Sequence, residues 1–208
     1  MAIITSYSTL QTAVADYLAR SDLTSFLPNF TQNFEERFYR QPDNWGSWME
    51  AALNVTISSA LGPVPADYLG LKVAYIGGLS RAPLKRMSLE QLYMRYPRAS
   101  ASGTPVYIAR NGANFEFGPY QSDGTLVGTY YAKPTLLRSF AGDAAAHFLI
   151  VNAPDLILYG SLLEAEPFIK NDQRLAIWGQ LYDAAVTAYR ARMNWEEFSG
   201  GAPHTVAG

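Results

Sequence analysis

Catalytic side chains are scarce in this sequence, and those present lack the spacing that catalysis needs. The only two histidines are His147 and His204. Neither has the spacing of a metal-binding pair or of the general base of a nucleophile. Glu164 and Glu166 are two positions apart, so a helix would point them to different faces and not into one acid–base site. We expect His147 to be a partly buried polar contact.

Other chemical signatures are missing as well. Neither Gly77-Gly78 nor Gly200-Gly201 leads into a helix with Lys-Ser/Thr, so the sequence predicts no phosphate loop. There is no Gly-x-Ser-x-Gly elbow and no cysteine, which excludes a disulfide, a thiolate metal ligand and a cysteine nucleophile. Glu35 and Glu36 next to Arg37 are interpreted as a solvated or interface-facing rim. The sequence therefore predicts no enzyme, no cofactor and no metal site.

Composition narrows the class of partner. The 208 residues are 49% hydrophobic but only 16% charged, so either partners cover some of the surface or the chain is a well-buried monomer. A net charge of −2 argues against a nucleic-acid-binding module, and the cations from Arg81 to Arg98 are only mildly clustered. The N-terminus does not resemble a signal peptide, and the longest apolar run, at 148–151, is too short to span a membrane.

The N-terminal segment has helical patterning. Ser8 with Gln11 predicts a capping box for a first helix. A row of phenylalanines, each four residues after the last, predicts a longer helix that starts near Pro28, runs to about Gln41 and faces a core. The members of this row are Phe26, Phe30, Phe34 and Phe38.

The C-terminal segment predicts a helical hairpin. Pro154 suits a first helical turn, and one helix is expected to reach Lys170, before Asn171-Asp172 breaks the chain. Apolar spacing then predicts which residues of the second helix are buried. These are Ala176, Ile177, Leu181, Ala184, Ala185 and Ala188. We expect Phe30, Phe34 and Phe38 to pack on this hairpin through Leu156, Leu163, Ile177 and Leu181.

The middle of the chain is rich in strands. Alternation over 53–58 predicts a strand, 61–65 a turn, 69–76 a second strand and 83–87 a third. Ser88 and Gln91 predict a second capping box, for a short helix to about Tyr96. Asn111-Gly112 predicts a hairpin between 105–109 and 114–118, followed by a last strand at 125–132.

Helices at both ends and strands in the middle predict an α+β fold. The N- and C-terminal segments are expected to form a helical bundle, and the middle of the chain a small antiparallel β region. The expected divisions are N-terminal bundle helices at 1–41, the β-rich middle at 42–140, the C-terminal hairpin at 141–198 and a flexible tail at 199–208.

Aromatic residues are the candidates for partner binding. Trp45 and Trp48 either anchor an interface or cap the end of the helical core. Beyond Trp195, the tail either docks on a partner or is unused. Its candidate anchors are Pro203, His204 and Val206.

Several blocks of sequence together resemble the head-to-tail adaptor (connector) proteins of tailed bacteriophages, which form the ring between portal and tail. The fullest block is 153–172 with 178–183. The others occur in the same order as in that family, so the resemblance spans nearly the whole chain. They are 10–23, 34–38, 64–69, 103–107 and 130–133.

The resemblance implies a structural virion protein of the neck, made in the host cytoplasm. It implies a homo-oligomeric ring, typically of twelve copies, with the portal protein above and a tail tube or nozzle protein below. Genomic DNA would pass through the lumen without sequence-specific binding, and no membrane is involved. Two alternatives remain, namely a head-completion or tail-terminator ring of different symmetry and a noncatalytic ligand-binding α+β domain.

Overall fold

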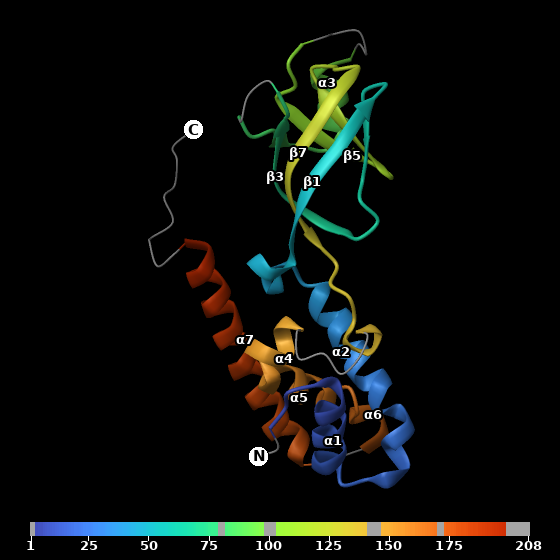
Figure 1. Cartoon of the computed structure of the whole chain (residues 1–208), viewed down its shortest axis with the longest axis vertical. Helices are drawn as coiled ribbons and strands as arrows, with labels where there is room; N and C mark the ends of the chain where they lie inside the picture. The colour runs from blue at the N-terminus through green and yellow to red at the C-terminus, as the bar shows by residue number, and fades with distance from the viewer. Residues whose placement is uncertain (1–2, 79–81, 98–102, 141–146, 170–172, 199–208) are drawn as a thin grey trace. The chain divides into compact units, whose positions relative to one another are not determined.

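The computed structural model describes residues 3–78, 82–97, 103–140, 147–169 and 173–198 (Figure 1). The chain forms two compact units, 1–48 with 134–208 and 49–133. The first unit is helical and the second is built on a sheet. This confirms the predicted α+β class.

The helical unit is assembled from both ends of the chain. Its longest helix, α7, covers the 25 residues of Arg174–Phe198. The α-helices before α7 in the described part of this unit are α1 (Tyr7–Leu18), α2 (Leu27–Tyr39), α4 (Phe148–Asn152), α5 (Pro154–Leu163) and α6 (Glu166–Ile169). Short 3-10 turns lie at η1 (Ser21–Phe26), η2 (Pro42–Asn44), η3 (Ser47–Met49) and η4 (Leu137–Ser139).

The phenylalanine row of α2 forms the centre of the helical core, as predicted. Phe30, Phe34 and Phe38 are all buried, whereas Phe26 is half exposed and leans on Phe168 with ring centroids 5.1 Å apart. Pro28 lies in the first turn of α2, where its missing N–H costs no helical hydrogen bond.

The buried face of α7 differs from the predicted one. Ile177 and Leu181 are exposed, as are Ala176, Ala184 and Ala188, and of the predicted stripe only Ala185 is buried. The Phe row instead packs against tyrosines of α7. The ring centroids of Phe34 and Tyr182 are 6.0 Å apart, and those of Phe38 and Tyr189 are 5.3 Å apart. The buried residues of α7 are Trp178, Ala185, Val186, Tyr189 and Met193. The prediction was wrong because α7 has two apolar faces, and the aromatic one packs inside.

Three local predictions for the helices also need correction. The first capping box is formed by Ser6 and Thr9, because Ser6 is extended and Ser8 already lies inside the helix. The single helix expected up to Lys170 ends at Leu163, and Pro167 belongs to the separate α6. Pro167 has no N–H to continue the α5 ladder. The expected break at 171–172 lies outside the described residues.

The second unit is a curled, mixed sheet of seven strands among the described residues, in the order β3-β7-β1-β2-β6-β5-β4. All its pairs are antiparallel except β4 with β5. Its elements are β1 (Glu50–Ser58), β2 (Leu61–Pro63), β3 (Tyr68–Ile76), β4 (Lys85–Arg86), α3 (Leu89–Arg95), β5 (Tyr107–Asn111), β6 (Asn114–Gly118) and β7 (Asp123–Ala132).

The two ends of this sheet approach each other. The backbone N–H of Leu84, just before β4, donates to Ala74 O on β3 at 2.8 Å. The curled sheet encloses an apolar core of its own, with Leu53, Ile57, Phe115 and Leu126 among its members. Closure of this kind covers strand edges that would otherwise be open to other chains.

Turn chemistry accounts for the remaining differences. The turn predicted at 61–65 begins two positions earlier, at Ser59 and Ala60, which take left-handed backbone angles. Residues 61–63 are instead strand β2, which pairs with β1. Gly112 has a φ of 58° between β5 and β6, as the Asn-Gly pair predicted. The second capping box, Ser88 with Gln91, is confirmed.

Candidate functional site

The described residues contain no group of three or more histidine, aspartate or glutamate side chains that could hold a metal ion. Two other features draw attention. One is a buried polar cluster in the helical unit, and the other is an aromatic groove in the sheet unit.

The buried polar cluster is centred on Glu35, which is completely buried on α2. The backbone N–H of Leu137 donates to both carboxylate oxygens of Glu35, at 3.1 and 3.2 Å. The hydroxyl of Tyr39 donates to Glu35 Oε1 at 3.1 Å and lies 3.4 Å from Nε2 of His147. The predicted rim role of Glu35 is therefore wrong, since this side chain ties the 137–139 turn to α2.

Burial sets the protonation of this cluster. It raises the pKa of Glu35 to about 7, against the lowering effect of the Leu137 and Tyr39 hydrogen bonds. Burial also lowers the pKa of His147 to about 4, and the backbone of Thr135 opposes that shift. Although His147 Nε2 lies 3.9 Å from Glu35 Oε1, the imidazole is neutral near pH 7, so we do not regard this contact as an ion pair.

A small cavity of about 240 Å³ adjoins the cluster. It is lined by Trp48, Pro134, Thr135, Phe140, His147 and Phe148. His147 is thus a buried polar contact, more deeply enclosed than predicted, with aromatic rings of Trp48 and Phe140 against its own. Among the described residues that line this cavity there is no serine, cysteine or lysine, and Thr135 carries the only hydroxyl. The hydrogen bonds of the cluster join α2 to the 137–139 turn, so a structural role explains it best.

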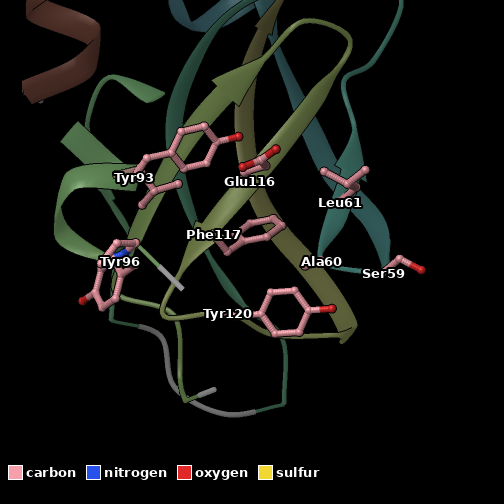
Figure 2. Close-up of a pocket in the computed structure, with 10 residues that line it drawn as sticks. Ser59, Ala60, Leu61, Tyr93, Tyr96, Glu116, Phe117 and Tyr120 are labelled. Atoms are coloured by element: carbon pink, nitrogen blue, oxygen red, sulfur yellow. The ribbon is translucent and has the colours of Figure 1, made fainter. Parts of the chain in front are cut away.

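The aromatic groove lies where α3 crosses the sheet (Figure 2). Its volume is about 630 Å³. Tyr93 and Tyr96 come from one side of α3, and Tyr120 lies just beyond β6. Phe117 and Glu116 project from β6, and 59–61 closes the far side.

Local contacts fix the shape of this groove. A side chain at Gly118 would collide with Leu92 and Tyr96, whose atoms lie 2.6 Å from the position of its Cβ, so glycine lets α3 sit close to β6. The Tyr93 hydroxyl donates to the Glu116 carboxylate, and this hydrogen bond raises the pKa of Tyr93. Asn111 donates to the same carboxylate at 2.7 Å. The result is a mostly aromatic groove with one acidic group inside.

Such a groove suits a protein segment. Tyrosine and phenylalanine supply large, fairly rigid contact area, and they are enriched where proteins meet. The sequence alone gives only a weak signal for these groove residues. Tyr93 and Tyr96, three residues apart on a capped helix, place two aromatic rings on one face, but neither charge nor a motif marks them.

Two of the predicted partner residues pack inside the helical unit. The indole N–H of Trp45 donates to Tyr39 O at 2.8 Å, and that of Trp48 donates to the Tyr189 hydroxyl at 2.9 Å. The Trp48 ring stacks on Phe148, with centroids 4.8 Å apart and planes 3° from parallel. Such contacts are the ones expected if the two tryptophans cap the end of the helical core. Both side chains nevertheless remain partly exposed.

Trp195 differs from them, because 67% of it is exposed on α7 and it has no role in the core. The three predicted tryptophans belong to the helical unit, whereas the residues of the aromatic groove belong to the sheet unit. Pro203, His204 and Val206 lie outside the described residues. Their role in partner binding stays a prediction.

Comparison with known proteins identifies the family. The family model of the SU10 adaptor protein matches residues 5–206, almost the entire chain. A search of curated proteins found no match. In the described part of the chain, no helix has both the length and the apolarity needed to cross a membrane. The phage adaptor family consists of structural virion components, and this chain belongs to the SU10 adaptor protein family.

Proposed function

We propose that this protein is a noncatalytic head-to-tail adaptor, twelve copies of which form a ring that joins the portal to the tail tube or nozzle. The family match over residues 5–206 carries this proposal. The low charged fraction and the exposed aromatic groove support it, because an assembly protein needs apolar surface for its neighbours.

DNA passes through the lumen of the proposed ring without being held. A basic lumen would bind phosphates and release counterions, which would retain the genome. At −2 per chain, twelve copies carry a formal charge of −24, twelve times the value for one chain. This charge favours free passage, since phosphates would find no net attraction to the ring.

The most direct test is to locate the protein in the virion. An electron microscopy map of the neck should contain this chain between capsid and tail. The mass of the isolated ring should be about 275 kDa, twelve times 22.9 kDa. A different multiple of 22.9 kDa would favour a head-completion or tail-terminator ring of different symmetry. Absence of the chain from the neck would overturn the proposal.

The segment after Trp195 is proposed to dock on the portal. Its last ten residues hold three glycines and one proline and no apolar periodicity, so they are poorly suited to pack on their own domain. Pro203, His204 and Val206 are the anchors. Deletion of residues 199–208 should weaken portal binding and leave the melting temperature unchanged. Portal binding as tight as that of the full chain would assign docking elsewhere.

The aromatic groove of the sheet unit is proposed to receive a segment of a tail protein. A Tyr93→Ala, Tyr120→Ala double variant should fail to join tails and still bind portal. Met94→Ala is a matched control, because Met94 is exposed on α3 and does not line the groove. Normal tail joining by the double variant would show that the groove is not the binding site for the tail protein.

A further inference from the structure

The outward side of α7 carries a second apolar row that the helical core does not use. Four large side chains stand at its two ends, with 58% of Ile177, 40% of Leu181, 67% of Trp195 and 45% of Phe198 exposed. Three exposed alanines occupy the middle. In order, the row is Ile177, Leu181, Ala184, Ala188, Ala191, Trp195 and Phe198.

The spacing of this row is that of a helix–helix seam. Successive members are alternately four and three residues apart, which is the heptad spacing of residues that face a partner helix. At about 1.5 Å per residue, the row extends roughly 32 Å. The buried residues of α7 lie on another side of the same helix, and α7 forms one side of its unit (Figure 1).

The row reads similarly from either end. Two large residues, three alanines and two large residues follow one another, with Ala188 at the centre. If two copies of α7 run antiparallel, Leu181 of one meets Trp195 of the other, and the alanines face alanines. Alanines at the centre let the two backbones come close. The pattern thus complements itself, which is the property of a two-fold contact.

Charge does not oppose this pairing, since the flank of the row beside α4 and α5 carries charges of both signs, Asp155 and Arg192. On the other flank of the row the side chains are Gln180, Thr187 and Asn194, all uncharged. When two helices run antiparallel about Ala188, this flank meets its own copy, so no like charges face each other there. A single helix face buries less than the roughly 800 Å² per partner of a standard stable interface. The resulting contact is weak and reversible.

We propose that the outer row of α7 is a self-association surface, on which α7 of a second copy of this chain packs antiparallel. A two-fold contact closes at two copies, so it belongs to the free protein and not to the closed ring. In the free protein it covers apolar surface that would otherwise promote aggregation. The proposal depends only on α7 and goes beyond the adaptor function.

The test uses the absence of cysteine from the chain, which lets single introduced thiols report contacts. Three variants, Ala188→Cys, Leu181→Cys and Trp195→Cys, are oxidised at submillimolar protein concentration, singly and as a mixture of the last two. Ala188→Cys should form disulfide-linked dimers, and Leu181→Cys should link to Trp195→Cys severalfold faster than to itself. Asp183→Cys, on an exposed side of α7 outside the row, is the control and should link only at the background rate.

Two results would overturn the proposal. If Leu181→Cys links mainly to itself, the helices run parallel. If no row position exceeds Asp183→Cys, a second copy does not pack on this face. Unchanged melting temperatures would show that the exposed substitutions leave the fold intact. Locating the chain in the virion neck is an independent measurement, so failure of this inference and failure of the adaptor function remain distinguishable.

Discussion

At the scale of single residues, Glu35 and His147 oppose each other as the pH changes. The pKa of Glu35 is raised from 4.5 to about 7, so folding favours its protonated form, and that stabilisation is lost as pH rises from about 4.5 to 7. The pKa of His147 is lowered from 6.5 to about 4, so its contribution is present above 6.5 and is lost as pH falls toward 4. Between pH 4.5 and 6.5 the two slopes largely cancel.

Replacing either group should therefore reveal the pH dependence of stability that the other group contributes. Glu35→Gln should make stability rise with pH from about 4 to 6.5, and His147→Gln should make it fall from about 4.5 to 7. Each slope approaches at most about 1.4 kcal/mol per pH unit. Urea unfolding at a series of pH values measures both slopes. Asp16→Asn, at an exposed carboxylate on α1, is the control, and a shared slope for all variants would contradict the assignment.

Gly160 is a position where one methyl group decides packing. A Cβ there would come within 2.2 Å of Phe34 Cδ2, and Phe34 is fully buried on α2. Gly160→Ala should destabilise the protein by about 1–3 kcal/mol through overpacking. Gly179→Ala is the matched control, because a Cβ on Gly179 of α7 meets no atom within 4 Å, and alanine there should stabilise by about 0.5–1 kcal/mol. Calorimetry of both variants should give melting shifts of opposite sign.

At the scale of elements, the sequence predicts the existence of helices and strands better than the faces they bury. The Phe row of α2, Pro154 at the start of α5 and the Asn-Gly turn follow local rules, and the structure confirms them. The buried face of α7 does not follow from such local rules, because its tyrosines and Trp178 compete with Ile177 and Leu181 for a place in the core. Only the three-dimensional fit to α2 and α5 decides between two apolar faces.

The candidate sites were predicted less well than the fold. Glu35 looked like a surface charge beside Glu36 and Arg37, and only the return of the 137–139 turn shows why a carboxylate is buried there. The aromatic groove combines residues of α3, β6 and the 59–61 turn, which are far apart in sequence. No local spacing predicts such a junction.

The two apolar faces of α7 should differ in how much they contribute to the stability of the fold. Met193 is buried, so Met193→Ala should cost about 2–5 kcal/mol of unfolding free energy. Leu181→Ala, on the outer row, should change that free energy by no more than about 0.5 kcal/mol. Denaturant titrations at micromolar concentration, where a weak α7 contact contributes little, give both values. A large loss of unfolding free energy in Leu181→Ala would show that Leu181 belongs to the core.

At the scale of the whole molecule, the two proposed contact surfaces belong to different units. The outer row of α7 belongs to the helical unit, and the aromatic groove belongs to the sheet unit. The sheet unit is one continuous segment, 49–133, while the helical unit is formed from the segments on either side of it. A continuous segment with its own core can fold without the rest of the chain.

The isolated segment 49–133 should therefore fold on its own. Its core residues, such as Leu53, Ile57, Phe115 and Leu126, all lie within the segment, and the Leu84–Ala74 hydrogen bond joins its two sheet ends. With about 85 residues it is large enough for one hydrophobic core, although a domain of this size has modest stability. We expect a cooperative thermal transition and dispersed amide resonances.

A core substitution in the same segment provides the control. Leu126 is completely buried on β7, so Leu126→Ala should cost about 2–5 kcal/mol of unfolding free energy. This loss should abolish the thermal transition or sharply lower its midpoint temperature. Val73→Ala, at a half-exposed position on β3, should have a much smaller effect. If the wild-type segment shows no transition while the full chain melts cooperatively, the sheet depends on the helical unit for its stability. The adaptor would then fold as one cooperative body instead of two.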